Sequence, residues 1–261
     1  MDFTGKTCVV TGAAGGIGYA LCQQYAESGA NVAMIDINAE VLEAKAKKLE
    51  EDYGVKTQTL AIDLASVAEI REAAAKIEEK FGAIYALANC AGVSIYGDPL
   101  TYTEAEWDKS LNINLKGAFF LIQACANNMV KYGTKGKIVS ISSQAGVLGE
   151  PNGHAYGASK AGICMITQTL AIDLAQYGIN VTAIAPGITK TGMIEKYLEE
   201  EAPRQGMTKD EFEAFRCEEI PMKRFAEPRE MADLLYYLTS DKATYITGAT
   251  INITGGNVNV Q

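Results

Sequence analysis

Tyr156 and Lys160 are the two residues whose types and spacing most directly indicate chemistry. They stand four positions apart in a stretch with helical periodicity that runs to about Tyr177, so both side chains should share one helix face. Lowering the pKa of a tyrosine from about 10 to near 7 takes roughly 4 kcal/mol. A partly buried lysine, together with a further positive charge nearby, could supply this stabilisation. The pair could therefore act as a general acid/base, although this spacing also occurs in purely structural helices.

A glycine-rich turn near the N-terminus could hold the phosphates of a nucleotide. Residues 11–18 read TGAAGGIG, between an apolar run that predicts the first strand and a segment that predicts the first helix. Glycines there let the backbone approach a pyrophosphate, and the first turn of the helix offers free N–H groups. The spacing differs from the commoner GxGxxG fingerprint. The expected phosphate contacts are Gly12, Gly15, Gly16, Ile17 and Gly18.

Asp36 ends the predicted second strand, 18 residues after Gly18. A carboxylate there can accept hydrogen bonds from the adenosine ribose and would repel a 2′-phosphate. NADP sites usually answer that phosphate with arginine or lysine, whereas residues 13–14 and 37–38 carry no positive charge. The sequence therefore predicts NAD as the cofactor, with Asp36 and Ile37 at the ribose. Asp36 could also be a helix N-cap.

Short apolar runs alternate with longer segments of helical periodicity along the chain. Several helical segments end at a glycine, the residue that best adopts a left-handed C-cap conformation. This alternation predicts one α/β domain over residues 1–261, a Rossmann-type doubly wound parallel sheet with helices on both faces. The predicted strands are Thr7–Val10, Asn31–Ile35, Thr57–Ile62, Ile84–Ala88, Lys137–Ile141, Asn180–Ala185 and Thr250–Ile253, the last helix is near Pro228–Thr239, and the glycines are Gly29, Gly54, Gly82, Gly133 and Gly178.

Residues 189–225 interrupt the alternation with a long acidic insertion. Insertions of this length with helical content are often active-site lids, so we expect a helical substrate lid. The alternative is a surface helix pair held together by its own apolar side chains. Those side chains are Met193, Ile194, Tyr197, Leu198, Met207, Phe212 and Phe215.

The composition argues against several classes of partner and site. The net charge of -9 disfavours nucleic acid, anionic membranes and strongly acidic partners. The six cysteines form no Cys-x-x-Cys pair and His154 is the only histidine, so no metal site of Cys/His type is expected. The sequence shows neither a signal peptide nor a run long enough to span a bilayer, which favours the cytoplasm and reduced cysteines.

Taken together, these features resemble the short-chain dehydrogenase/reductase family over essentially the whole chain. The family pattern places a serine 13 residues before the tyrosine, as Ser143 stands here. Cys90 departs from the usual asparagine, and Thr254 stands where the family often has aspartate. The matching motifs are residues 11–18, residues 89–92 (NCAG), Asn114, Ser143, Tyr156 with Lys160, Pro186 with Gly187, residues 245–248 (YITG) and Gly255 with Gly256.

The resemblance implies alcohol–carbonyl interconversion with a nicotinamide cofactor, and commonly a homotetramer. Tyr156 would be the general acid/base, Lys160 would lower its pKa and hold the nicotinamide ribose, and Ser143 would polarise the substrate carbonyl. Asn114 would hold a water that links Lys160 to a proton relay. The other implied cofactor contacts are Asp63 and Leu64 near the adenine, Asn89, Ala91 and Gly92 along the floor, and Pro186, Gly187, Ile188 and Thr191 at the nicotinamide.

Other functional classes match less well. A serine hydrolase needs a GxSxG elbow, and the nearest sequence, GASKA at 157–161, lacks the last glycine. A histidine-based triad would have to use His154, and a P-loop hydrolase lacks the glycine upstream of residues 5–7. A non-enzymatic NAD sensor stays open because a fold alone does not fix function. The presence of both Tyr156 and Lys160 favours an enzyme.

The side chains expected near the catalytic pair favour a polyol or sugar substrate. The ending at residues 253–258 (ITGGNV) also resembles that of sorbitol-type dehydrogenases. A hydroxysteroid or bile acid would need a broad apolar cleft, which residues 189–225 could build. A 3-oxoacyl thioester on an acidic carrier protein is disfavoured by like charge. The polar candidates are Ser94, Tyr96, Gln144, Glu150, Asn152 and His154.

Overall fold

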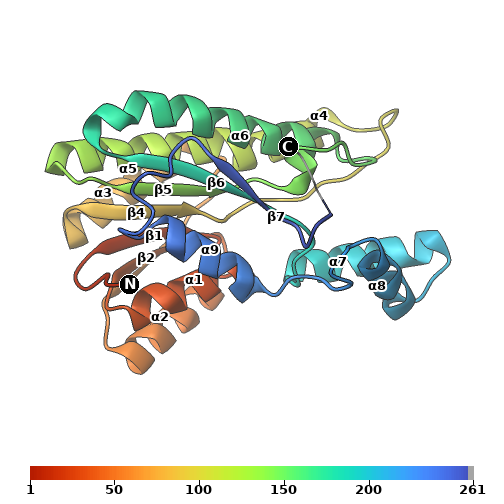
Figure 1. Ribbon diagram of the computed structural model, residues 1–261, viewed down its shortest axis with the longest axis horizontal. Helices are drawn as coiled ribbons and strands as arrows, with labels where there is room; N and C mark the ends of the chain where they lie inside the picture. Colours follow the sequence, from red (N-terminus) through yellow and green to blue (C-terminus); the bar gives the residue numbers. More distant parts are fainter. Residues whose placement is uncertain (258–261) are drawn as a thin grey trace.

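The computed structural model describes residues 1–257, and residues 258–261, including Val258 of the sorbitol-type ending, lie outside the described residues. The described strands form one parallel sheet of seven strands in the order β3-β2-β1-β4-β5-β6-β7 (Figure 1). The predicted strands are all present, with ends within one residue of the prediction. The strands are β1 (Thr7–Thr11), β2 (Asn31–Asp36), β3 (Thr57–Ala61), β4 (Ile84–Asn89), β5 (Lys137–Ile141), β6 (Asn180–Pro186) and β7 (Thr250–Ile253).

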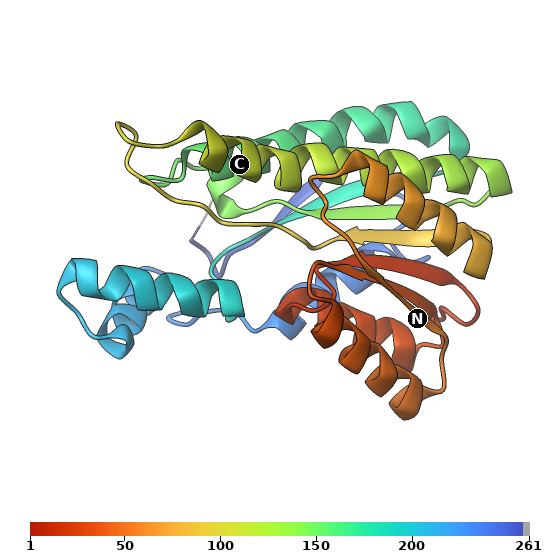
Figure 2. The ribbon, with the colours of Figure 1, turned by 180° about the vertical axis from the view of Figure 1, so that it is seen from behind.

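Helices cover both faces of the sheet (Figures 1 and 2). Each face has its own core, one built around Leu21, Leu42 and Leu235 and the other around Ile77 and Leu121. Strands between two such layers are buried on both sides, which explains their continuous apolar runs. One layer holds α1 (Gly16–Glu27), α2 (Ala39–Tyr53) and α9 (Pro228–Leu238), and the other holds α3 (Val67–Phe81), α4 (Glu104–Leu111), α5 (Ala118–Tyr132) and α6 (His154–Leu174).

The predicted helix-ending glycines all have positive φ values, and Gly54, Gly133 and Gly178 are left-handed C-caps. The structure thus confirms the α/β prediction at the level of single turns. No helix within residues 1–257 is long and apolar enough to cross a membrane.

The strand order reverses direction at β1, which pairs with β2 on one side and β4 on the other. The loops after β1 and β4 therefore part at the carboxyl edge of the sheet, where doubly wound folds bind their ligands. The Thr11 hydroxyl oxygen joins these loops, accepting hydrogen bonds of 3.0 Å from the backbone N–H groups of Cys90 and Ala91. The glycine turn and the 89–92 motif are therefore brought together at this point.

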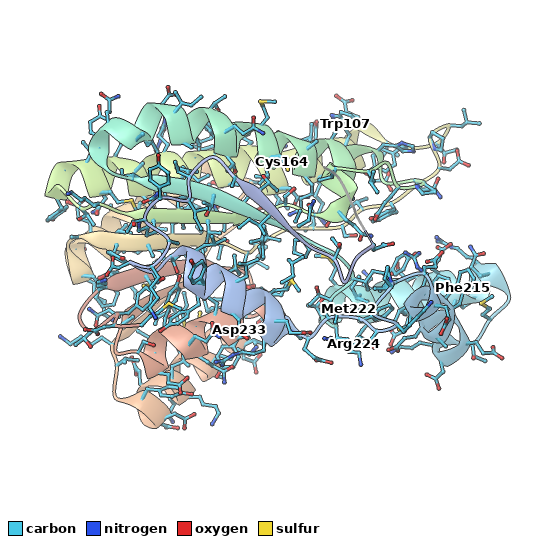
Figure 3. The ribbon with its side chains drawn as sticks, viewed as in Figure 1. Trp107, Cys164, Phe215, Met222, Arg224 and Asp233 are labelled. Atoms are coloured by element: carbon cyan, nitrogen blue, oxygen red, sulfur yellow. The ribbon has the colours of Figure 1, made fainter. Side chains whose placement is uncertain are left out.

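Residues 189–225 project beyond the carboxyl edge as two helices, α7 (Gly192–Glu201) and α8 (Lys209–Glu218) (Figures 1 and 2). Leu198, Phe212 and Phe225 form the centre of a small core of their own. Met193 is 42% exposed, and Phe215, on α8 in Figure 3, is 49% exposed. The segment is therefore a helix pair that packs largely on itself, and its use as a lid stays a prediction.

Candidate active site

Tyr156 and Lys160 share one face of α6, as their spacing predicted. The Lys160 Nζ atom lies 5.7 Å from the centre of the Tyr156 ring. Lys160 is only 4% exposed, and its ammonium donates a hydrogen bond of 2.8 Å to the carbonyl oxygen of Ile141, at the end of β5. Burial lowers the pKa of Lys160 to about 8.

The pKa of Tyr156 is raised, chiefly because the phenol is buried. A hydrogen bond with the Ser143 side chain lowers it, whereas the negative charge of Glu150 raises it. The chain's own groups therefore favour the protonated phenol, because removing the ring from water disfavours phenolate more than its neighbours stabilise it. Ser143 and Tyr156 together present hydroxyl groups on one side of the site.

Asn114 lies in a π-helical turn, Asn112–Gly117, between α4 and α5. Its side chain is buried, accepts a hydrogen bond of 2.8 Å from the backbone N–H of Val93, and donates to the carbonyl oxygen of Val93 and to the Ser159 hydroxyl. A Cβ atom on Gly92 would lie 3.3 Å from both Asn114 Oδ1 and Lys160 Nζ. Asn114 therefore ties the cofactor floor to α6 beside Lys160, while the water relay stays a prediction.

The glycine turn is a close-packed backbone surface in which side chains at Gly12 and Gly18 would collide with neighbouring backbone atoms. Gly12 has a φ of 64°, and a Cβ atom there would lie 3.0 Å from the backbone nitrogen of Ala91. A Cβ atom on Gly18 would lie 2.3 Å from the carbonyl oxygen of Gly12. Gly15 is the N-cap of α1, so the first N–H groups of the helix are presented next to this turn. These residues fit the pyrophosphate of a dinucleotide.

A second helix begins against this turn. A Cβ atom on Gly16 would lie 3.3 Å from Thr191 Cγ2 and from Pro228 Cγ. Thr191 is the N-cap of α7, so the positive ends of α1 and α7 converge. Thr191 therefore lies beside the phosphate turn, and its predicted contact with the nicotinamide end of a cofactor stays a prediction.

Asp36 is tied to the glycine turn at the end of β2. Its carboxylate accepts hydrogen bonds of 3.0 Å from the N–H of Ala14 and 3.1 Å from the N–H of Asn38. Asn38, not Asp36, is the N-cap of α2 and accepts from the N–H of Val41. The helix-cap alternative for Asp36 is therefore excluded, and a contact of its carboxylate with a ribose stays a prediction.

Lys45 is a neighbour of this site that the sequence analysis missed. Its ammonium donates a hydrogen bond of 2.8 Å to the carbonyl oxygen of Ala14 and lies 4.2 Å from the centre of the Tyr19 ring. The sequence feature that could have identified Lys45 is its position two helical turns after the N-cap Asn38, on the same face of α2. A positive charge thus does lie near Asp36, although the strand and turn themselves carry none.

The remaining predicted cofactor residues occupy the same edge. Asp63 Oδ1 accepts a hydrogen bond of 2.8 Å from the N–H of Ala65, and the carbonyl oxygen of Leu64 packs against Gly117. Asn89 is buried at the end of β4. Gly187 follows β6 and donates its N–H to the carbonyl oxygen of Ile253. The contacts of these residues with a cofactor stay predictions. The neighbours named in the same predictions are Ile17, Ile37, Ala91, Pro186 and Ile188.

Cys90, the first departure from the family pattern, is a structural residue in this fold. Its side chain packs against the core on the α1 side of the sheet. Burial raises the pKa of its thiol to about 12, which keeps it neutral. The substitution is therefore accommodated without adding a charge beside Lys160.

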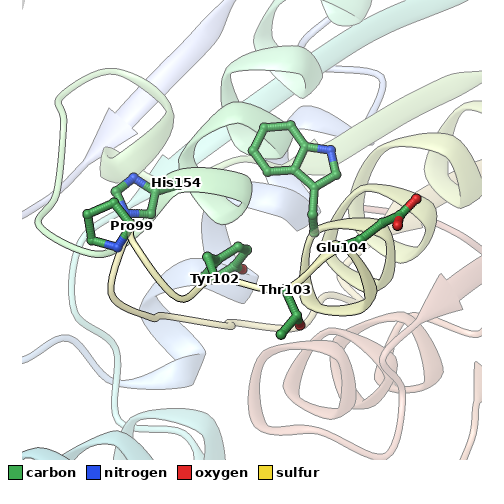
Figure 4. A pocket seen from close by; sticks show the side chains of 6 residues that line it. Pro99, Tyr102, Thr103, Glu104 and His154 are labelled. Carbon is green, nitrogen blue, oxygen red and sulfur yellow. The ribbon is translucent and has the colours of Figure 1, made fainter.

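Among the six polar candidates, three form a group and His154 stands apart from it. Tyr96, Gln144 and Glu150 form one hydrogen-bonded network, and the Tyr96 ring lies 5.7 Å from the Tyr156 ring. His154 instead packs edge-on against Tyr102. Together these two side chains line part of a surface pocket of about 340 Å³ (Figure 4). Only the group of three is joined to the catalytic pair.

Comparison with known proteins agrees with this arrangement. A family model described as enoyl-(acyl carrier protein) reductase matches residues 12–257. The chain belongs to the short-chain dehydrogenase/reductase family. As a member of this family it is an oxidoreductase that acts on alcohol and ketone groups.

Its relatives in the short-chain dehydrogenase/reductase family differ in substrate and cofactor. The chain is 37% identical to the 3-oxoacyl-(acyl-carrier-protein) reductase FabG of Thermotoga maritima, over 99% of this chain and 100% of the relative. An NAD⁺-bound xylitol dehydrogenase is 32% identical with a TM-score of 0.91, over 98% of this chain and 100% of that one. The L-sorbose reductase of Gluconobacter frateurii, complexed with NADPH and L-sorbose, is 26% identical with a TM-score of 0.94, over 100% and 99%.

Proposed function

We propose that this protein is an NAD-dependent dehydrogenase that interconverts a polyol or sugar alcohol with the corresponding ketone. The observation that carries the proposal is the polar network of Tyr96, Gln144 and Glu150 beside the Tyr156 ring. A hydroxyl-rich substrate can donate hydrogen bonds to the acceptor sites that these groups leave open, whereas an apolar substrate would cover those sites without bonding them. The similarity to a xylitol dehydrogenase and an L-sorbose reductase supports the same substrate class.

The chain's residues supply the proton chemistry of this reaction. Tyr156 removes the hydroxyl proton during oxidation and returns it during reduction, while the Ser143 hydroxyl donates a hydrogen bond to the substrate oxygen. Lys160 holds its positive charge beside the phenol and binds the ribose hydroxyls. NAD would supply the hydride acceptor for this reaction. The glycine turn and residues 89–92 would hold the cofactor, and Asp36 would bind its adenosine ribose.

The two other substrate classes have less support. A steroid needs apolar walls, yet Leu198 and Phe212 of the 189–225 segment are buried in that segment's own core. Reduction of a 3-oxoacyl thioester is favoured by the similarity to the Thermotoga maritima reductase. The net charge of -9 opposes it, because like charges suppress encounter with an acidic carrier.

A substrate screen tests the proposal. Purified enzyme is assayed with xylitol, hexitols and their ketoses, a hydroxysteroid, and acetoacetyl-coenzyme A, each with NAD(H) and NADP(H). We expect the highest kcat/KM with a polyol or ketose and NAD(H). Efficient turnover of the steroid or the thioester, with polyols at background, would replace the proposed substrate class.

Replacing Asp36 by alanine should weaken the binding of NAD and reduce the preference of the enzyme for NAD over NADP, measured as the ratio of kcat/KM. The loss expected for NAD is about 10- to 100-fold in kcat/KM, since a hydrogen bond to a charged group contributes about 1.5–3 kcal/mol. Lys45, already near Ala14, should help the variant accept the 2′-phosphate. Asp36→Asn separates the charge from the hydrogen-bond acceptor and is the matched control. An unchanged cofactor preference in both variants would mean that another group recognises the ribose.

Three further properties belong to this proposal. Residues 189–225 close over the substrate, since Tyr197 of α7 lies 6.2 Å from Tyr96, ring centre to ring centre. The protein works as a homotetramer, as the family resemblance implies, and in the cytoplasm, where its cysteines stay reduced. Analytical ultracentrifugation tests the assembly, and hydrogen exchange of α7 with and without NAD tests the closure.

A further inference from the structure

Glu150 is a carboxylate held by one side chain of its own loop and one of the loop between β4 and α4. It lies between β5 and α6, and its Oε2 accepts a hydrogen bond of 2.6 Å from the Tyr96 hydroxyl. Its Oε1 accepts one of 2.9 Å from the Gln144 amide nitrogen. The Gln144 oxygen in turn accepts a hydrogen bond of 3.2 Å from Asn257. Because Gln144 is buried and bonded at both ends, the carboxylate has a fixed orientation.

This carboxylate belongs to the substrate side of the site. Tyr96, which donates to it, lies between Tyr156 and Tyr197 of α7, with ring centres 5.7 Å and 6.2 Å away. A Cβ atom on Gly187 would lie 3.3 Å from the Gln144 oxygen, which places the network next to the β6 loop. Besides burial, the charge of Glu150 raises the pKa of Tyr156. Glu150 therefore acts on the reacting end of the pocket.

The network offers mainly hydrogen-bond acceptors to an incoming molecule. An ionised carboxylate has about four lone-pair sites, of which the hydrogen bonds from Tyr96 and Gln144 use two. The Tyr96 hydroxyl donates its only hydrogen bond to Glu150, so its oxygen can only accept further hydrogen bonds. Neutral hydroxyl groups match these acceptors, whereas a carboxylate or phosphate on the substrate would meet a fixed negative charge.

We propose that Glu150 makes the enzyme select neutral substrates over anionic ones. Its carboxylate accepts a hydrogen bond from a hydroxyl group of a neutral polyol or ketose, and it excludes substrates that carry a carboxylate near the reacting carbon. The inference rests on the proposed function for the identity of the neutral substrate, but not for the exclusion of acids. Like charges brought together in a binding site repel, so discrimination of about 100-fold in kcat/KM is expected.

The test uses Glu150→Gln, which removes the charge and keeps the shape. A hexitol is compared with the aldonate of equal length, in which a carboxylate replaces a terminal alcohol. We expect the hexitol-to-aldonate ratio of kcat/KM to fall by about tenfold or more in the variant, mainly through KM. Tyr96→Phe is the matched control, because it removes the hydrogen bond to Glu150 but leaves the charge. Tyr96→Phe should lower kcat/KM for both substrates alike and keep their ratio within about threefold of the wild-type ratio.

A second substrate pair separates this inference from the proposed function. Ethyl acetoacetate and acetoacetate share a reducible ketone and differ mainly in the charge. If the hexitol is not oxidised but Glu150→Gln raises kcat/KM for acetoacetate relative to that for ethyl acetoacetate, the polyol assignment fails and the role of Glu150 stands. Two results would overturn the role of Glu150. In the first, Glu150→Gln leaves the neutral-to-charged ratio of kcat/KM unchanged for the pair that is turned over. In the second, Tyr96→Phe changes that ratio as much as Glu150→Gln does.

Discussion

Replacing Tyr156 by phenylalanine should remove nearly all turnover while leaving NAD binding largely intact. The phenol is the only group in the proposed mechanism that exchanges a proton with the substrate oxygen, and general acid–base catalysis contributes about 10²–10⁴-fold. Removal of the hydroxyl leaves the ring, its contact with Tyr96 and the adjacent Lys160 in place. The measurements are kcat for the best substrate of the screen and the Kd for NAD by fluorescence titration.

A second tyrosine of the same region provides the control. Tyr177 lies just beyond α6 and is 48% exposed, so Tyr177→Phe should behave as the wild type. Turnover by Tyr156→Phe within about tenfold of the wild type would exclude Tyr156 as the acid/base. Loss of NAD binding in the same variant would instead indicate that the ring supports the cofactor site.

The two directions of the reaction should depend oppositely on pH. Burial raises the pKa of Tyr156, so the protonated phenol that donates to a carbonyl predominates at neutral pH. Oxidation needs the unprotonated phenolate and should therefore accelerate towards alkaline pH, while reduction should slow only where the phenol itself begins to lose its proton. Initial rates with an alcohol and with its ketone from neutral to alkaline pH provide the check. Parallel profiles in both directions would contradict the assignment of Tyr156.

Replacing Gly18 by alanine should disrupt the cofactor turn. The new Cβ atom would lie 2.3 Å from the carbonyl oxygen of Gly12 and 2.7 Å from its carbon, both backbone atoms that cannot rotate away. Forcing an extra methyl group into a filled space costs about 1–3 kcal/mol, so KM for NAD should rise about 10- to 100-fold and Tm should fall. Substrate turnover at saturating NAD should change less than the affinity for NAD.

Gly15→Ala is the graded comparison for this prediction. Its Cβ atom would lie 3.2 Å from the same Gly12 oxygen, which needs a shift of only a few tenths of an ångström. We therefore expect a smaller rise in KM than in Gly18→Ala. Equal effects of the two substitutions, or an unchanged KM in Gly18→Ala, would show that the turn does not set the affinity for NAD.

Local features of the chain were predictable from the sequence. The inner strands were placed to within one residue because burial on both faces leaves a continuous apolar run. The common face of Tyr156 and Lys160 follows from helical geometry over four residues. The left-handed conformations of Gly54 and Gly133 follow from the steric freedom of glycine. The family motifs carried the same local information over the whole chain.

Tertiary packing decided the features that depend on residues far apart in the sequence. Lys45 reaches Ala14 only because α2 packs beside the glycine turn. The polarity of the substrate side depends on Tyr96, Gln144 and Glu150, whose side chains meet across separate loops. Periodicity and spacing act over a few residues, whereas loop contacts and the balance between burial and charge at Tyr156 are fixed only when the layers of the fold come together. The sequence by itself therefore determined the sheet and the catalytic pair, and the folded structure decided what surrounds that pair.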